Sequence, residues 1–156
     1  MNLPSVAIRR MTLEDLDRVV EIAQSLKSAP QWPRPAYVEA LDPQAALPRI
    51  ALAAVDCISG GVAGFAVASV MPPQAELESI AVDPAFQRSG VAKGLFAVLL
   101  AEIRSAQVTE VILEARASNF PALTLYGALG FVEIGRRPRY YADPIEDAVL
   151  MRLRLG

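Results

Sequence analysis

Residues 87–94, with the sequence QRSGVAKG, have the composition of a site for a phosphate-bearing ligand. Gly90 stands where a predicted helix begins, and the first turn of a helix has backbone N–H groups without intrahelical acceptors. These groups and the positive end of the helix dipole suit a diphosphate, and Arg88 and Lys93 add positive charge. The same residues also suit an ordinary left-handed turn beside two solvated cations. Local chemistry leaves both interpretations open.

Several other kinds of site are excluded by what the sequence lacks. The spacings G-x-x-x-x-G-K-[ST] and G-x-G-x-x-G do not occur, which excludes a nucleoside-triphosphate P-loop and a dinucleotide fingerprint. Because there is no histidine, Ser-His-Asp and Cys-His catalysis and a histidine-bound metal are also excluded. The single cysteine, Cys57, cannot form an internal disulfide or a Cys-rich zinc site, and its apolar neighbours predict a small buried side chain. We therefore expect no metal, and acid–base chemistry from carboxylates, tyrosine, lysine or water.

Length and composition predict one cytoplasmic domain over residues 1–156. Hydrophobic residues make up 53% of the chain and charged residues 21%, and no apolar run reaches the length of about 18 residues that a membrane span needs. The N-terminus becomes charged within its first ten residues, unlike a signal peptide. The net charge of −2 provides no electrostatic reason to expect a nucleic-acid partner, and we expect no membrane partner.

Residue patterns predict strands and helices in alternation. Apolar residues at helical spacing follow Thr12, a typical N-cap, and two strand-like runs flank Gly60 and Gly61 as in a hairpin. Residues 27–48 are rich in proline and are expected to form a loop around one short helix. The expected strands are 6–9, 50–55, 62–70, 77–82, 108–115, 131–134 and 148–153, and the expected helices are 12–26, 35–41, 89–105 and 120–129.

This order, β-α-α-β-β-β-α-β-α-β-β, predicts an α/β fold. We expect a mixed central sheet of about seven strands with helices on both faces. In such a fold a ligand binds where loops leave the carboxyl ends of the parallel strands. By strand alternation, Glu76, Glu78, Ile80 and Val82 are expected to share one face of the sheet.

Three blocks of the sequence resemble the GNAT superfamily of N-acetyltransferases. Residues 80–92, IAVDPAFQRSGVA, are similar to its motif A, with Ala92 where many members have glycine. LEARASN at 113–119 and LYGALGF at 125–131 form the second block. GRRPRYY at 135–141 and EDA at 146–148 form the third, which is similar to the ribosomal-protein alanine N-acetyltransferase (RimI-like) branch. Together the blocks follow the family order over roughly half of the chain.

The resemblance implies a GNAT fold and acetyl-CoA as co-substrate. The pantetheine arm would run along the backbone of Ile80, Ala81 and Val82, where strands 77–82 and 108–115 separate. Asn119, which is also expected to cap a helix, would contact the cofactor near Tyr126. The diphosphate would lie on the loop and the helix start, with these residues around it: Gln87, Arg88, Ser89, Gly90, Val91, Ala92 and Lys93.

The resemblance also implies the catalytic groups. Tyr126 corresponds to the family tyrosine near the CoA sulfur, which would protonate the departing thiolate. Glu114 resembles the glutamate of the alanine acetyltransferases, and a carboxylate in an apolar strand suits a general base because desolvation raises its pKa. Glu78 is the alternative, because in the wider superfamily a glutamate on the strand before motif A often serves as base. Ordered water is the third possibility, and the sequence does not choose among them.

Two segments are candidates for the acceptor site. Trp32 lies among prolines and resembles a Pro-Trp pair of the alanine acetyltransferases, although an aromatic residue at this place equally suits a packing role. Arg137, Tyr140 and Tyr141 lie in residues 136–143, which are expected to form a loop that contacts an acceptor peptide.

The first functional hypothesis is transfer of an acetyl group to the N-terminal amine of a protein such as a ribosomal protein. A second is acetylation of a small amine (an amino acid, a polyamine or an antibiotic) on the same fold. A third is a module that binds acetyl-CoA without turnover. Fold alone does not decide the acceptor.

Overall fold

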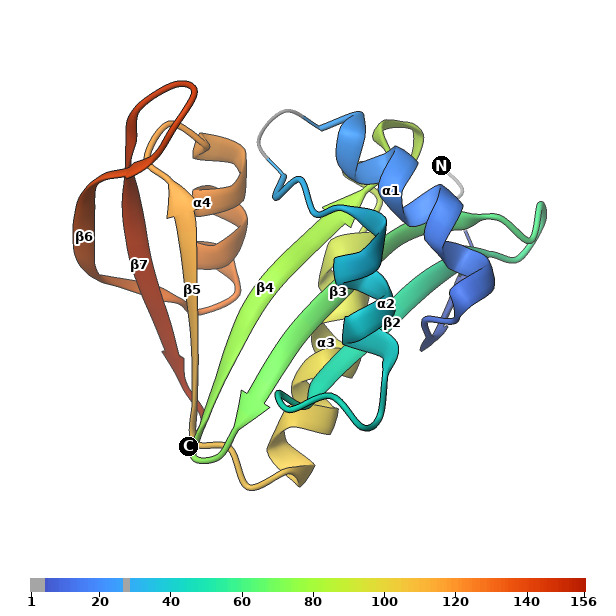
Figure 1. Ribbon diagram of the computed structural model, residues 1–156, viewed down its shortest axis with the longest axis horizontal. Helices are drawn as coiled ribbons and strands as arrows, with labels where there is room; N and C mark the ends of the chain where they lie inside the picture. The colour runs from blue at the N-terminus through green and yellow to red at the C-terminus, as the bar shows by residue number, and fades with distance from the viewer. Residues whose placement is uncertain (1–4, 27–28) are drawn as a thin grey trace.

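The computed structural model describes residues 5–26 and 29–156, and the first two residues of the predicted loop 27–48 lie outside these ranges. Seven strands form one sheet with helices on both faces (Figure 1). The strands are β1 (Val6–Arg10), β2 (Arg49–Asp56), β3 (Val62–Met71), β4 (Gln74–Val82), β5 (Glu110–Arg116), β6 (Val132–Tyr141) and β7 (Glu146–Arg154). The helices are α1 (Leu16–Gln24), α2 (Arg34–Leu41), α3 (Val91–Ser105) and α4 (Phe120–Ala128), with short 3-10 turns at Leu13–Asp15 and Pro84–Phe86. The predicted order of strands and helices is confirmed.

The helices divide into two layers because the sheet has an apolar surface on each side. Fully buried Leu95, Leu99 and Ile103 of α3 belong to one hydrophobic cluster, against which α4 also packs. Leu16 and Val19 of α1 belong to a second cluster, together with α2. The central strand β3 is buried from Val62 to Val70, as expected for a strand covered on both faces.

The strand order is β1-β2-β3-β4-β5-β7-β6, and among the described residues β4 with β5 is the only parallel pair. Their pairing is short: it runs from Gln74 opposite Glu110 to Glu76 opposite Ile112. Beyond these positions β4 continues to Val82 and β5 to Arg116 without pairing to one another. Figure 1 shows the two strands meeting near the C-terminus and separating toward the opposite end of the sheet. The predicted separation of these strands is therefore present in the fold.

A β-bulge in β4 alters which residues share a face. On β3, Val67 pairs with Ser79 but the next residue, Ala68, pairs with Leu77, so Glu78 is an extra residue in β4. Ala75 and Leu77 before the bulge, and Ile80 and Val82 after it, all pack in the cluster of α3. The expected common face of Glu76, Glu78, Ile80 and Val82 is wrong, because the extra residue reverses the alternation.

Two other expectations are wrong at exposed positions. Residues 136–141, expected in a loop, belong to β6, which is a nearly fully exposed edge strand paired with β7. An edge strand needs few apolar residues, and the arginines of this segment therefore gave it the polar pattern that is typical of a loop. Cys57 is exposed rather than buried. It follows the last residue of β2, and the turn that contains it is held by the Asp56 carboxylate, which accepts from Ser59 Oγ at 2.8 Å.

No helix in residues 5–26 and 29–156 has the length and apolar character to cross a lipid bilayer. This observation agrees with the absence of a long apolar run in the sequence.

Gly64 allows a close approach between β3, β4 and α3. A Cβ atom at this position would lie 2.9 Å from the carbonyl oxygen of Ala81 and 3.4 Å from Cδ1 of Leu95. Because the nearest atom belongs to the backbone, we expect Gly64→Ala to lower the free energy of unfolding by about 1–3 kcal/mol. The matched control is Gly127→Ala in α4, where a Cβ meets nothing within 4 Å; it should stabilise the protein by about 0.5–1 kcal/mol. Urea unfolding of both variants measures the difference, and equal midpoints would contradict the close approach.

Candidate active site

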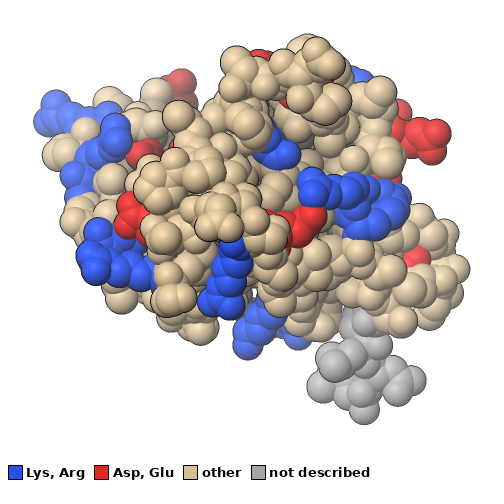
Figure 2. All heavy atoms as spheres, turned by 90° about the horizontal axis from the view of Figure 1, so that it is seen from below, with Lys and Arg blue, Asp and Glu red and all other residues tan. Residues whose placement is uncertain are grey.

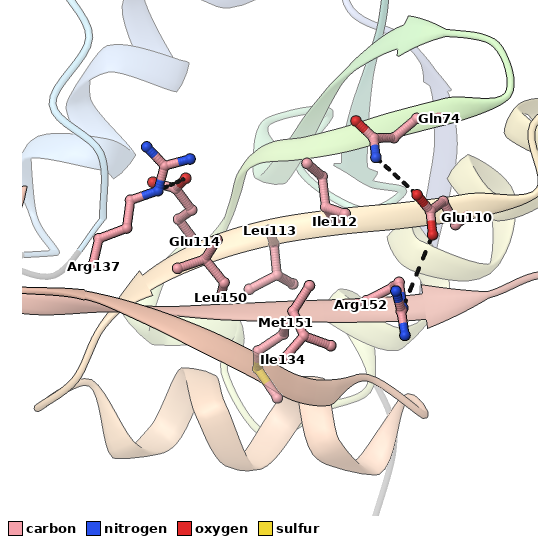
Figure 3. Close-up of a pocket in the computed structure, with 10 residues that line it drawn as sticks. All are labelled: Gln74, Glu110, Ile112, Leu113, Glu114, Ile134, Arg137, Leu150, Met151 and Arg152. Carbon is pink, nitrogen blue, oxygen red and sulfur yellow. Dashed lines mark hydrogen bonds and ion pairs between the residues drawn. The ribbon is translucent and has the colours of Figure 1, made fainter.

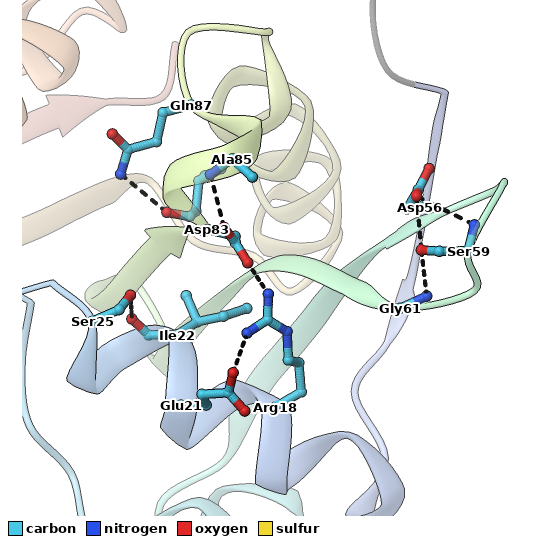
Figure 4. A network of polar contacts seen from close by, with 11 residues as sticks. Arg18, Glu21, Ile22, Ser25, Asp56, Ser59, Gly61, Asp83, Ala85 and Gln87 are labelled. Atoms are coloured by element: carbon cyan, nitrogen blue, oxygen red, sulfur yellow. Dashed lines mark hydrogen bonds and ion pairs between the residues drawn. The ribbon is translucent and has the colours of Figure 1, made fainter.

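The first part of the loop after β4 is held in place by side-chain contacts (Figure 4). Asp83 accepts a hydrogen bond from the Ala85 N–H at 2.8 Å, and its carboxylate also pairs with Arg18 of α1. The Gln87 side chain returns to β4, where its Nε2 donates to the carbonyl of Val82 at 3.1 Å. The start of the predicted cofactor loop is therefore fixed to the strand that precedes it and to the helix that covers it.

The rest of this loop forms the N-terminus of α3. Arg88 and Gly90 have φ angles of +61° and +86°, and the second fits a glycine because L side chains disfavour that region. The N–H of Gly94 donates to the carbonyl of Gly90 at 3.0 Å and is thus satisfied within the helix. The N–H groups of the preceding turn point out of the helix end, and Arg88 and Lys93 are exposed beside them. This arrangement suits an anion, as the sequence predicted.

The edge of β4 that faces the strand separation is formed by the predicted pantetheine segment. Ile80, Ala81 and Val82 pair with Ala66, Phe65 and Gly64 of β3 on one side. On the other side β5 has already diverged, since the last pair is Glu76 with Ile112. Backbone groups on that edge therefore have no strand partner in β5. The Val82 carbonyl accepts from Gln87, and the remaining edge groups need another partner. An extended ligand arm with amide groups would provide it.

Tyr126 lies on α4, whose first turn is capped as predicted. The Asn119 side chain accepts from the Ala122 N–H at 3.3 Å, and Pro121 occupies the first turn. The Tyr126 ring is half-buried and meets the Phe131 ring edge-on, with centroids 5.9 Å apart. Burial raises the pKa of Tyr126 to about 12, and the charge of Tyr141 acts in the same direction. Its hydroxyl therefore keeps its proton at neutral pH.

The two carboxylates proposed as base have different partners. Glu78 accepts from Arg49 at 2.8 Å (Nε to Oε1) and 3.4 Å (Nη2 to Oε2), and both side chains are about one-sixth exposed, at 16% and 17%. Glu114 lies 3.2 Å from Nε of Arg137, an arginine that is 56% exposed. Glu78 is thus held by a mostly buried cation in two contacts, whereas the partner of Glu114 is largely in solvent and contacts it once.

Sequence reasoning did not propose Glu76 as a site residue. Desolvation raises the pKa of its carboxyl, and the negative charges of Glu78 and Glu114 add to the effect. Glu76 is also the last residue of β4 that pairs with β5. The signal that could have identified it is its position two residues before Glu78. If β4 lies beside β5, both acids are then close to Glu114 of β5.

The aromatic candidates lie on two sides of this charged group. Trp32 covers Arg49, with 5.9 Å between its ring centroid and the Arg49 Cζ. On β6, a bulge between Arg137 and Tyr141 contains Tyr140 and also Arg139, whose φ is +52°. The ring centroids of Tyr140 and Tyr141 are 5.1 Å apart.

Charged neighbours hold the two tyrosines. Arg137 lies over the Tyr140 ring at 5.6 Å and Arg116 over the Tyr141 ring at 4.4 Å. The Glu114 charge raises the pKa of Tyr140. Arg137 and Tyr140 therefore lie together at Glu114. Their contact with an acceptor stays a prediction.

A cavity of about 300 Å³ begins at the Glu114–Arg137 pair and runs along β5 and β7 (Figure 3). At its far end Glu110 accepts from Gln74 at 2.8 Å and lies 3.9 Å from Arg152. Glu114 and Arg137 are the predicted site residues that line this cavity, and no residue of the predicted cofactor loop 87–94 lines it. On the face shown in Figure 2, basic and acidic side chains form small separate groups.

Comparison with known proteins identifies relatives over most of the chain. Residues 16–131 match the acetyltransferase (GNAT) family. The chain is 42% identical over 100 residues to the [ribosomal protein bS18]-alanine N-acetyltransferase of Escherichia coli K12, which covers 63% of this chain and 68% of that protein.

Two crystal structures extend the similarity over the whole fold. That of the ribosomal-protein-S18-alanine N-acetyltransferase from Escherichia coli has a TM-score of 0.84 and 31% identity, over 97% of this chain and 95% of that one. That of Ard1 from Thermoplasma volcanium has a TM-score of 0.82 and 27% identity, over 97% and 98%. The predicted fold is confirmed.

Proposed function

The chain belongs to the acetyltransferase (GNAT) family of acetyl-CoA-dependent N-acetyltransferases, and on this basis we propose that it acetylates the N-terminal amine of a protein, such as a ribosomal protein that begins with alanine. One observation carries the proposal. The segment predicted for pantetheine, with Ile80, and the proposed base Glu114 both lie on the parts of β4 and β5 beyond their last pair. The two reactants would therefore meet where these strands separate.

We infer that acetyl-CoA is held mainly by backbone groups. The free edge of β4 at Ile80, Ala81 and Val82 would pair with the amides of pantetheine, and the N-terminal turn of α3 would bind the diphosphate. Arg88 and Lys93 are exposed there and would add charge. Asn119, at the start of α4, and Tyr126 on that helix would lie beside the thioester end. When bound, acetyl-CoA supplies an activated acyl carbon and a thiolate leaving group.

Glu114 and Tyr126 would divide the proton transfers between them. A free α-amino group has a pKa of about 8, so part of the acceptor is already a neutral nucleophile near neutral pH. Glu114, directly or through water, would take the proton that the amine loses as its nitrogen bonds to the acyl carbon. The Tyr126 hydroxyl would protonate the sulfur as the carbon–sulfur bond breaks. Because burial raises its pKa to about 12, Tyr126 holds this proton at any pH at which the amine is reactive.

The acceptor would enter between Trp32 on one side and Arg137, Tyr140 and Tyr141 on the other. Support comes from the charge at this place, where Glu76, Glu78 and Glu114 outnumber Arg49 and Arg137. Three carboxylates and two guanidinium groups leave one negative charge in excess, and this excess attracts an ammonium group. The bS18-alanine acetyltransferase of Escherichia coli supports a protein N-terminus as the source of that group.

Binding and transfer assays test the proposed function. We expect acetyl-CoA and CoA to bind in isothermal titration, and a ribosomal-protein peptide with a free N-terminal alanine to be acetylated. The control is the same peptide with a blocked N-terminus, which should not react. Acetylation of a polyamine or amino acid in preference to the peptide would contradict the protein acceptor, and absence of CoA binding would contradict the cofactor site.

Replacing the proposed acid tests its role. Tyr126→Phe removes the hydroxyl and keeps the ring packed against Phe131, so we expect kcat to fall by about 10²–10⁴ with CoA affinity unchanged. Since the pKa of Tyr126 is raised to about 12 and its protonated form is the active one, the wild-type rate should rise with pH and show no loss from this group below that value. Wild-type kcat in Tyr126→Phe would exclude Tyr126 as the acid. A wild-type protein that binds acetyl-CoA but acetylates no amine would favour a module that binds without turnover.

The three carboxylates are separated by matched substitutions. We expect Glu114→Gln to lower kcat by about 10² or more, as for loss of a general base. Glu78→Gln should affect kcat much less, because its carboxylate is occupied by Arg49 in two contacts. Glu76→Gln is the third member of the series. Steady-state kinetics at saturating acetyl-CoA give kcat for all three variants. A larger loss of kcat in Glu78→Gln or Glu76→Gln than in Glu114→Gln would assign the role of base to that residue.

A further inference from the structure

Arg49 is a mostly buried arginine with no part in the proposed chemistry. It begins β2, and its side chain is 17% exposed. Its guanidinium makes two contacts with Glu78, at 2.8 and 3.4 Å, and lies 5.9 Å from the centroid of the Trp32 ring. One planar group therefore binds a carboxylate with its edge while an indole covers it, a combination that suits arginine and not lysine.

These contacts connect two parts of the site that are distant in sequence. Glu78 is the extra residue in the bulge of β4, just before the edge proposed for pantetheine. Trp32 precedes α2 and lies against Tyr37, with 5.2 Å between ring centroids. Tyr37 is fully buried and meets the Phe65 ring edge-on at 5.9 Å. Trp32 thus lies between a rigid buried ring and the Arg49–Glu78 pair.

We propose that Arg49 is a positioning residue for acceptor binding: through Glu78 and Trp32 it holds one side of the acceptor site at a fixed place relative to β4. The inference rests on the proposed function. Without the guanidinium, one face of the Trp32 indole has no packing partner, and the side chain takes several orientations. Acceptor binding must then fix the indole in one orientation, which costs conformational entropy. This cost falls on binding and not on the chemical step, so it raises KM for the acceptor.

Two substitutions and one control measure this effect. We expect Arg49→Met to raise the acceptor KM by about tenfold or more, with kcat and CoA affinity changed by less than about threefold. Arg49→Lys should fall between this variant and the wild type, because lysine keeps the charge but cannot contact both carboxylate oxygens in a planar fork. The control is Arg10→Met. Arg10 is 60% exposed and pairs with Glu102 of α3, on the opposite face of the sheet, and its loss should leave both constants unchanged.

Trp32 is the only tryptophan, so its fluorescence reports the same contact without an activity assay. In Arg49→Met we expect emission at longer wavelength and stronger quenching by acrylamide, in Arg49→Lys a smaller change, and in Arg10→Met none. Glu78→Gln, which keeps an oxygen acceptor, provides a milder variant should Arg49→Met fail to fold, and its emission should shift in the same direction.

The outcomes separate this inference from the proposed function. An unchanged Trp32 emission in folded Arg49 variants, or an acceptor KM equal to that of the wild type, would overturn the positioning role while leaving the acetyltransferase intact. A fall in kcat alone would also overturn it. If the wild-type protein acetylates no N-terminal peptide, the proposed function fails, and with it the role of Arg49 in acceptor binding, whatever the fluorescence shows.

Discussion

The site depends on the early end of the pairing between β4 and β5. Three residue pairs join these strands, and β4 then continues for six residues that separate from β5 and do not pair with it. An unpaired backbone edge inside a fold needs another hydrogen-bonding partner. Here the separation is possible because β3 pairs with β4 from Gln74 to Val82, apart from the extra residue Glu78, and α3 packs against it, so β4 is held in place without β5. A ligand can then replace the missing strand.

The bulge at Glu78 also decides which side chains of β4 face the site. Ile80 and Val82 after the bulge pack toward α3, and Glu78 lies where Arg49 of β2 reaches it. Each of the two proposed bases therefore has its own arginine, one mostly buried and one largely exposed. A carboxylate in two contacts with a buried guanidinium is costly to release, whereas one beside a solvated arginine can change partners. This difference, and not the residue type, distinguishes Glu114 from Glu78.

The strands β6 and β7 form the other side of the site, and an arginine holds this side in place too. Arg116, two residues after Glu114, donates to the carbonyls of Ala142 and Pro144 at 3.2 Å each and covers the Tyr141 ring. It connects the end of β5 to the turn between β6 and β7. The bulge that contains Tyr140 is fixed by the Arg139 N–H, which donates to Asp147 at 3.0 Å. Tyr140 and Tyr141 are therefore placed by contacts from three strands.

The sequence by itself determined the features that depend on nearby residues. The helix cap at Asn119, the turn at Gly60, the left-handed Gly90 and the order of the elements could all be predicted, because short-range chemistry and periodicity decide them. Thr12, the other predicted cap, precedes a 3-10 turn, and α1 begins at Leu16. The segment QRSGVAKG suggested an anion site through its own backbone, and the N-terminus of α3 suits one, but the site itself stays a prediction.

Only the tertiary structure decided the features that depend on a partner distant in the chain. The extra residue at Glu78 is visible only when β4 is aligned with β3, and a shift of one residue exchanges the faces of a strand. The partners of Glu78 and Glu114, the strand identity of residues 136–141 and the exposure of Cys57 follow from the same cause. Each of these features depends on a second segment that lies next to the residue in the fold, because strand pairing and burial need two segments.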